Sequence, residues 1–524
     1  MMRQTNLARR DEVVIIDTSD KEAPVYGDDI NLMQNREAFQ SFDAGKNAPL
    51  VSLVFIAYNN LEKYTKPAIE ALLKYSNDVD YELILIDNGS TDGTLEYFQS
   101  LNVPKKRIFH VTKNFGTFYG LIASAHAACG HLFYGKYMVY VPNDVIVTKN
   151  WLKNLVYCME SDECIGVAVP CSDNVSNFES VDLNFRNMDE MQEKAAAFNI
   201  SNPKLWEEKL RVIPFVSITR TSLFNVYWDD YAFVYQSADD DMSFQYRRMG
   251  YKLVCCFDTF VHHAGFVSVR NNQEYVAAVD KGRAIFRKKY FGIDAWTDTL
   301  DILSSMNHVL ATHIMKKEKP HILAINVRCG AKILDAKNAL RKVDAMITPI
   351  FDAYTEDPKY WLDLKTVVEG DVFSAPLSCL CEICNAQRYD VIFMGEHLTR
   401  AKDWRKFLLD AYALLAPQGT LIVHVRKYPK DETVQQIFDR MMSLEVNDVG
   451  FYQTVEDFLN EHRLLHEWQT CDILLEDEFI AYNLFTQPVD IIKTLQVRGL
   501  DKKFTYENFC AARQGQLLIL HKNK

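Results

Sequence analysis

The sequence predicts an α/β protein built from two successive units, each with a mainly parallel sheet covered by helices. Two observations carry this prediction. Continuous apolar runs that suit buried strands alternate with segments of helical spacing between Val51 and Val141. The same alternation begins again near His321. A chain of 524 residues also has room for two to four domains.

The first unit is expected over residues 49–274, after a polar, mixed N-terminal extension of residues 1–48. Its strands are expected at Val51–Ala57, Leu83–Asp87, Ile108–Val111 and Tyr137–Val141. Its helices are expected at Lys63–Tyr75, Thr94–Leu101 and Gly120–Cys129, with a helix-leaning stretch at Asp189–Lys209. Pro67 is compatible with a helix only in the first turn.

A helical connector is expected over residues 275–319, which contain few Gly or Pro residues, and a second α/β unit over residues 320–524. The strands of this unit are expected at His321–Val327, Tyr389–Met394, Thr420–Val425 and Gln516–His521. Its helices are expected at Ala331–Arg341 and Asp403–Leu415.

Composition excludes several classes of function. A net charge of −12 argues against general binding to nucleic acid or anionic membrane. No run approaches the roughly 20 apolar residues of an integral membrane segment, and the first residues lack the apolar core of a signal peptide. Twelve scattered cysteines favour reduced thiols and a cytoplasmic location. The densest group, Cys379, Cys381 and Cys384, lacks the second ligand pair of a zinc site.

Polar residues follow four strands of the first predicted sheet. Because ligands bind beyond the carboxyl ends of strands in open α/β sheets, these residues predict a binding crevice at one edge. A solvated turn would explain any one of them equally well. The four stretches are Ala57-Tyr58-Asn59, Asp87-Asn88-Gly89-Ser90, Asn114-Phe115-Gly116 and Pro142-Asn143-Asp144.

Residues 49 to about 270 resemble the family 2 glycosyltransferases with the GT-A fold. The resemblance is carried, in order, by "VSLVFIAYNN", "LILIDNGSTDGT", "NFG", "YVPNDVIV", "DDDMSFQYRRMGYKL" and "VHHAG". It implies transfer of a sugar from a nucleotide-diphosphate donor to an acceptor hydroxyl, usually with inversion at the anomeric carbon. UDP- or dTDP-sugars are the donors it favours. The donor-binding positions that it implies are Ala57, Tyr58, Asn59, Asp87, Asn88, Asn114, Gly116 and Asn143.

The resemblance also implies a divalent cation, Mn²⁺ or Mg²⁺, that neutralises the departing diphosphate. The family's Asp-x-Asp motif aligns with Pro142-Asn143-Asp144, so Asp144 is the one strong anionic ligand. His262 aligns with a histidine that often completes this site. A strand-end cap for Asp144 and a structural role for His262, next to His263, are the alternatives.

A carboxylate near the acceptor hydroxyl serves such enzymes as general base. Aligned on Arg248, the family's acidic pair falls on Ala238 and Asp239, and its later aspartate falls on Asp241. Asp239 is therefore the expected base and Asp241 a supporting residue. Acidic residues are also favoured at any helix N-terminus, which is the competing explanation of this run.

Three stretches of the second half resemble class I S-adenosylmethionine-dependent methyltransferases: "ILAINVRCGAKIL", "VVEGDVF" and "YDVIFMGEHLTRAKDWRKFLLDAYALLAPQGTLIV". The resemblance implies a Rossmann-like domain. Its glycine-rich turn keeps only Gly330 and carries the bulky Arg328, so we expect S-adenosylmethionine to bind weakly or not at all. Gly330, Asp352 and Asp371 are the positions to suspect if it does.

The leading hypothesis is an inverting, cytoplasmic glycosyltransferase that acts on a glycan or on a protein such as flagellin. Two alternatives stay open: a bifunctional glycosyltransferase and methyltransferase, and an inactive carbohydrate-binding protein. The latter would explain the missing acids at Pro142 and Ala238.

Overall fold

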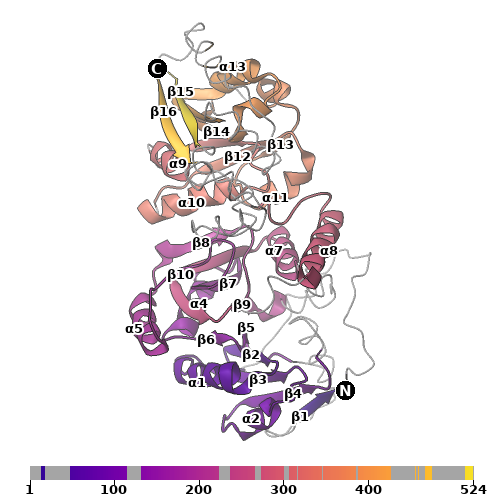
Figure 1. The fold of residues 1–524 in the computed structure, drawn as a ribbon. Coiled ribbons are helices and arrows are strands. Elements are labelled where there is room, and N and C mark those ends of the chain that lie inside the picture. The colour runs from indigo at the N-terminus through magenta and orange to yellow at the C-terminus, as the bar shows by residue number, and fades with distance from the viewer. Residues whose placement is uncertain are drawn as a thin grey trace, which may run out of the picture. The chain divides into compact units, whose positions relative to one another are not determined.

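The computed structural model describes most of both predicted units. The residues it describes are 13–17, 48–114, 132–223, 237–265, 273–299, 306–315, 317–344, 346–384, 388–426, 455, 458, 467–474 and 514–522. The chain divides into two compact units, Met1–Lys288 and Lys289–Lys524, which are described separately (Figure 1).

The first unit contains a sheet with strand order β1-β4-β3-β2-β5-β9-β7-β10-β6, and β8 pairs with β10. Strands β1 to β5, β7 and β10 run parallel, whereas β9 runs antiparallel between β5 and β7. The bounds are β1 Val13–Ile16, β2 Val51–Ala57, β3 Tyr81–Asp87, β4 Lys106–Val111, β5 Tyr137–Pro142, β6 Val145–Ile146, β7 Ile165–Ser172, β8 Trp206–Lys209, β9 Ser217–Arg220 and β10 Lys252–His263.

Both faces of this sheet are buried, which explains the unbroken apolar runs. In β2, Leu53 and Phe55 belong to one core cluster, and Val54 and Ile56 belong to another. The first cluster takes in residues of the helices α1, α2 and α4, which accompany the strands in Figure 1. The helices of this unit are α1 Lys66–Tyr75, α2 Thr94–Ser100, α4 Trp151–Ser161, α5 Met188–Phe198, α7 Ala238–Arg248 and α8 Gln273–Lys289.

Helix α7 carries the predicted base and packs against β10. Its Met242, Tyr246 and Met249 share a core cluster with Leu253 and Cys255 of the strand. Because α7 immediately precedes the parallel strand β10, its N-terminus lies toward the carboxyl edge of the sheet. The acidic first turn is thus at the edge where the polar strand ends lie.

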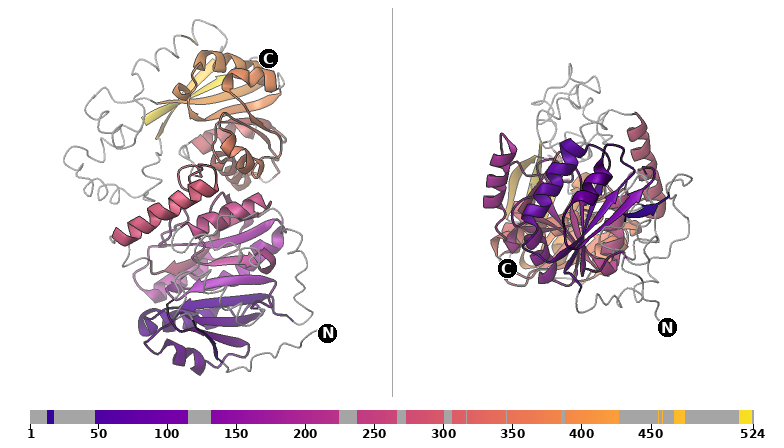
Figure 2. Two further views of the ribbon diagram at one scale, coloured as in Figure 1. Left: turned by 90° about the vertical axis from the view of Figure 1, so that its right-hand side faces the viewer. Right: turned by 90° about the horizontal axis from the view of Figure 1, so that it is seen from below.

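The second unit has a sheet of order β13-β12-β11-β14-β15-β17-β16, in which β17 runs antiparallel to β15 and β16. Figure 2 shows its last strands in orange and yellow. The prediction of a second α/β unit with a mainly parallel sheet is confirmed. The strands are β11 His321–Ile325, β12 Ile350–Thr355, β13 Val372–Ser374, β14 Tyr389–His397, β15 Leu415–Arg426, β16 Glu467–Leu474 and β17 Gln514–His521. The helices are α9 Met306–Ile314, α10 Ala331–Val343, α11 Trp361–Lys365, α12 Leu380–Ile383 and α13 Trp404–Leu414.

Several predicted elements differ in detail. The helix expected from Lys63 begins at Lys66, which puts Pro67 in its first turn, after a π-helical turn at Leu61–Thr65. The helix-leaning stretch ends in strand β8, because residues 206–209 pair with β10. Strand β7 was not predicted. The helix expected at 120–129 lies outside the described residues.

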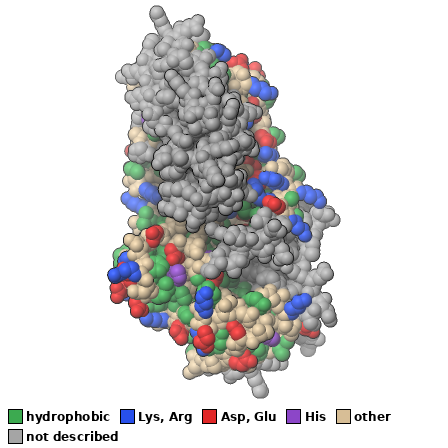
Figure 3. Space-filling model, in the orientation of Figure 1, with side chains coloured by type: hydrophobic (Ala, Val, Ile, Leu, Met, Phe, Trp, Pro, Cys, Tyr) green, Lys and Arg blue, Asp and Glu red, His purple; other side chains and the backbone are tan. Residues whose placement is uncertain are grey.

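Two further observations concern the charges on the surface and the length and hydropathy of the helices. On the face shown in Figure 3, the basic and acidic side chains of the described residues are interspersed. Across the parts of the chain that the structure describes, no helix is both long and apolar enough to cross a bilayer.

Candidate functional site

The loops that follow β2 and β3 are joined by hydrogen bonds. The backbone N–H of Asn59 donates to Ser90 Oγ at 2.9 Å, and the N–H of Thr91 donates to Asn59 Oδ1 at 2.9 Å. The N–H of Asn88 donates to the carbonyl oxygen of Ala57, also at 2.9 Å. The structure therefore brings together these predicted donor-binding positions, but it uses the Asn59 amide and the Ala57 carbonyl to shape the loops.

Gly89 lets the loop after β4 approach the loop after β3. Its φ is +77°, and a Cβ atom placed there would lie 2.7 Å from the backbone nitrogen of Asn114. Asn114 is exposed, as is Tyr58 after β2, so both predicted positions face solvent. Gly116 lies outside the described residues.

Asp87 is not the open carboxylate that its position after β3 suggested. Its side chain is 0% exposed. Oδ1 accepts a hydrogen bond from the backbone N–H of Ser90 at 3.1 Å, and Oδ2 lies 2.6 Å from Nδ1 of His110. His110 stands opposite Asp87 in the register of β3 and β4. Sequence reasoning missed His110, because no local motif marks it.

Asn143 and Asp144 follow β5 and differ in accessibility. Asn143 Nδ2 donates to the carbonyl oxygen of Asn59 at 3.2 Å and to Thr65 Oγ1 at 3.0 Å, so this side chain braces the β2 loop. Asp144 keeps 34% of its side chain exposed. Its Oδ2 lies 3.4 Å from Nε2 of His263. Asp144 is thus a carboxylate that a ligand can reach.

The histidine beside Asp144 is His263, whereas the sequence pointed to His262. His262 instead places Nδ1 2.7 Å from Asp173 Oδ2. Successive residues of a strand face opposite sides, and the pairing of β10 with β6 sets His263 opposite Val145. Asp173, at the end of β7, carried no sequence signal of its own.

The two histidine–aspartate contacts shift the pKa values of His263 and Asp173. Burial opposes protonation of His263, but the hydrogen bond and charge of Asp144 outweigh it and raise the pKa of His263. Burial likewise works against ionisation of Asp173, yet its bond to His262 lowers the pKa of Asp173 overall. The contacts therefore favour protonated His263 and ionised Asp173.

The residues near Asp144 fit a metal ion that is shared with a ligand. Among the described residues, no group of three or more His, Cys, Asp and Glu side chains is arranged to hold a metal ion. Asp144 and His263 provide one oxygen and one nitrogen donor. Mn²⁺ and Mg²⁺ accept such donors and take further oxygens from phosphates.

The three aspartates of α7 have different surroundings. Asp241 is fully buried, and its Oδ2 accepts a hydrogen bond from Gln245 Nε2 at 2.6 Å. Asp240 is buried with its Oδ1 3.0 Å from Arg211 Nη1. Asp239 is the partly exposed member. Although part of the side chain is exposed, desolvation of its carboxylate, and then the charge of Asp240, raise the pKa of Asp239 well above its usual value. Asp239 can therefore meet a substrate, whereas Asp241 supports the helix.

In the second unit, the loop expected to approach a cofactor makes hydrogen bonds with other protein groups. Asn326 Nδ2 donates to Glu356 Oε2 at 3.2 Å, and Glu356 Oε1 accepts from the backbone N–H of Leu377 at 3.1 Å. Arg328 donates to the carbonyl oxygen of Thr297 at 2.6 Å. The asparagine after β11, the carboxylate after β12 and the arginine of the loop thus all make hydrogen bonds within the protein.

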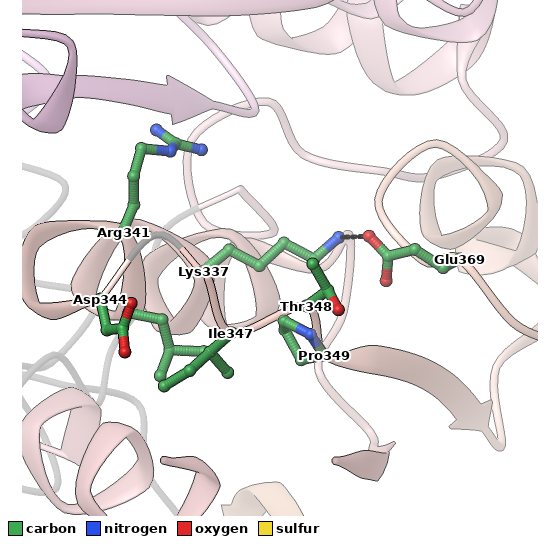
Figure 4. Close-up of a pocket in the computed structure, with 8 residues that line it drawn as sticks. Lys337, Arg341, Asp344, Ile347, Thr348, Pro349 and Glu369 are labelled. Carbon is green, nitrogen blue, oxygen red and sulfur yellow. Dashed lines mark hydrogen bonds and ion pairs between the residues drawn. The ribbon is translucent and has the colours of Figure 1, made fainter. Parts of the chain in front are cut away.

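The positions suspected for a cofactor lie in and beside β12 and α10. Asp352 is buried in the middle of β12, where Tyr389 OH and the backbone N–H of Asp371 donate to it. Gly330 begins α10 with φ +99°. A cavity of about 490 Å³ lies beside Lys337 of α10 and Glu369, which form an ion pair (Figure 4).

Comparison with known proteins agrees with the geometry of the first unit. Residues 52–224 match the family described as Glycosyl transferase family 2. A curated protein of Haemophilus influenzae, named "Uncharacterized glycosyltransferase", is 31% identical over 120 residues. That alignment covers 23% of this chain and 36% of the relative, so the chain spans about a third of that relative's length.

Solved structures resemble parts of the chain. GalNAc-T7 with UDP, GalNAc and Mn²⁺ is 15% identical with a TM-score of 0.33, over 45% of this chain and 48% of the other. A putative methyltransferase from Bacillus halodurans is 12% identical with a TM-score of 0.29, over 42% of this chain and 100% of the other.

Proposed function

We propose that the chain, whose residues 52–224 match the family described as Glycosyl transferase family 2, transfers a sugar from a nucleoside-diphosphate donor to an acceptor hydroxyl, with inversion at the anomeric carbon. UDP- or dTDP-sugars are the proposed donors, and a glycan or a protein is the proposed acceptor. The cytoplasm is the proposed location.

The observation that carries the proposal is the contrast between two accessible aspartates and their buried neighbours. Asp144 and Asp239 keep exposed surface, whereas Asp87, Asp240 and Asp241 are buried. Asp144 follows β5, and Asp239 begins the helix before β10, so both lie at the carboxyl edge of the sheet. This edge also carries the joined loops after β2, β3 and β4.

In the proposed reaction, the acceptor oxygen attacks the anomeric carbon, and the bond to the diphosphate oxygen breaks. Asp239 takes the acceptor proton, and its raised pKa suits a base that works near neutral pH. The nucleoside diphosphate leaves with the bonding electron pair. Mn²⁺ or Mg²⁺, held by Asp144 and His263, would supply positive charge to that leaving group.

We also propose that the second unit serves as a scaffold or recognises the acceptor. The engaged Asn326–Glu356 pair supports this choice over methyl transfer.

A screen of nucleotide sugars tests the proposal. The full chain is incubated with UDP-, dTDP-, GDP- and CDP-sugars and Mn²⁺, and both donor hydrolysis and thermal stabilisation are measured. At least one donor should be hydrolysed and should raise the melting temperature. The same screen with Asp239→Asn should retain the stabilisation and lose the hydrolysis. Absence of both signals for every donor would rule out the proposed activity.

A further inference from the structure

The end of the proposed donor site that would bind the nucleobase contains a histidine–aspartate pair, and its aspartate is buried. Asp87 has no exposed surface, and both of its carboxylate oxygens have partners, Ser90 N–H and His110. A carboxylate in that state cannot itself accept a hydrogen bond from a nucleobase. The side chain bonded to it, His110, is 21% exposed.

The second ring nitrogen of His110 is available to a ligand. Nδ1 is bonded to Asp87. Nε2 makes no hydrogen bond with the residues that the structure describes. It is also not among the side-chain atoms of these residues that are both buried and without a partner. His110 is the second-last residue of β4, and the loop that follows the strand packs against Gly89. The partly exposed ring therefore lies near the point where the loops after β3 and β4 approach each other.

We propose that Nε2 of His110 makes a hydrogen bond with the nucleobase of the donor and that Asp87 holds the imidazole ring in position through Nδ1. This inference rests on the proposed function. A carboxylate only accepts hydrogen bonds, so Asp87 keeps the proton of the neutral imidazole on Nδ1 and makes Nε2 an acceptor. An acceptor at Nε2 pairs with a base whose ring nitrogen carries a hydrogen.

Uracil and thymine carry that hydrogen on N3, and guanine carries one on N1. Cytosine and adenine present a lone pair at the corresponding ring nitrogen, so two acceptors would face each other. The pair at His110 and Asp87 thus selects bases with a ring N–H, and it selects against cytidine and adenosine donors.

The bond from Ser90 makes the role of Asp87 testable. In Asp87→Asn, the Ser90 N–H still needs an acceptor, so the amide oxygen must take the place of Oδ1. The amide NH₂ then faces His110 and donates to Nδ1, which moves the ring proton to Nε2. The histidine becomes a donor toward the base, and the base preference should reverse. The same change of tautomer explains the loss of activity when the aspartate of a serine-protease triad becomes asparagine.

The test is calorimetry of the full chain with UDP, dTDP, GDP, CDP and ADP in the presence of Mn²⁺. The wild-type protein should bind the first three roughly five- to tenfold more tightly than CDP and ADP, which is the effect of about one hydrogen bond. His110→Ala should bind all five alike, and Asp87→Asn should favour CDP. His313→Asn, which removes a histidine of α9 in the second unit, is the matched control and should leave every affinity unchanged.

His110→Gln serves as a second variant if His110→Ala fails to fold, since glutamine both donates and accepts and should abolish the preference. Retention of the wild-type preference in the folded His110 variants overturns the inference, and so does equal binding of all five nucleotides by the wild-type protein. Failure of the wild-type protein to bind any of them would instead overturn the proposed function.

Discussion

Arg211 and Asp240 form a buried ion pair, with Nη1 of the arginine 3.0 Å from Oδ1 of the aspartate. Arg211 follows β8, and Asp240 lies in the first turn of α7. Val212 continues the connection, because its N–H donates to Ser243 Oγ, which in turn donates to the carbonyl oxygen of Asp239. The pair therefore fixes the start of the helix that presents the proposed base.

Removing Arg211 should destabilise the first unit. Arg211→Leu removes a buried ion-pair partner of Asp240, and breaking a buried ion pair costs about 3–5 kcal/mol in comparable cases. The melting temperature of the first unit should fall, and Arg211→Leu combined with Asp240→Asn should recover part of the loss. Lys105→Ala, which breaks the exposed pair with Asp80, is the control and should cost no more than about 1 kcal/mol. An equal effect of Arg211→Leu and Lys105→Ala would contradict this account.

Asp239→Asn should separate binding from transfer. Loss of a general base typically lowers a rate by about 10²- to 10⁴-fold, whereas donor affinity should survive because the donor loops lie after β2 to β5. Since burial and Asp240 raise the pKa of Asp239, the wild-type transfer rate should rise with pH as Asp239 loses its proton. Transfer rates and donor affinities across pH give both readouts. A wild-type transfer rate in Asp239→Asn would show that another group is the base.

Donor binding in the presence of Mn²⁺ should depend on both Asp144 and His263. Asp144→Ala and His263→Gln should each weaken donor binding in Mn²⁺ by about tenfold, the loss of about one ligand contact. His262→Gln is the adjacent comparison, and it should have a smaller effect on the metal because His262 is bonded to Asp173. Turnover should stop in excess EDTA and return with Mn²⁺ or Mg²⁺. Undiminished turnover in EDTA would mean that protein groups alone stabilise the diphosphate.

Glu179 should make the stability of the first unit depend on pH. Burial raises the pKa of its side chain to about 7, so the folded state favours the protonated acid. The stability contributed by this group is present below the unfolded pKa of about 4.3 and is lost as pH rises through about 7. Glu179→Gln should therefore gain stability relative to the wild-type protein between pH 5 and pH 8. Melting temperatures at those two pH values, with the exposed Glu193→Gln as control, measure the difference. A constant difference at both pH values would contradict the expectation.

S-adenosylmethionine should not bind the second unit with micromolar affinity. Asn326, Glu356 and Arg328 make their hydrogen bonds within the protein, so a cofactor would have to break them. Calorimetry of the full chain with the cofactor, and with UDP as a positive control for active protein, measures this. A micromolar dissociation constant would restore the bifunctional hypothesis.

The sequence by itself determined both α/β sheets and the edge at which the first sheet carries polar residues. Strands β2, β3, β5 and β11 were predicted because burial on both faces demands unbroken apolar runs, and such runs are local in the sequence. The polar stretches at Asp87 and Asp144 were visible for the same reason, since each directly follows its strand. Strand β8 was not visible, because it depends on pairing with the distant β10.

Only the tertiary structure decided which side chains at that edge can meet a ligand. Whether Asp87 is open or closed depends on His110, 23 residues away, through the register of β3 and β4. The choice between the neighbours His262 and His263 depends on which face of β10 turns toward Asp144, and the pairing with β6 sets that face. Access and protonation are properties of contacts between strands, and contacts between distant segments leave no local pattern in a single sequence.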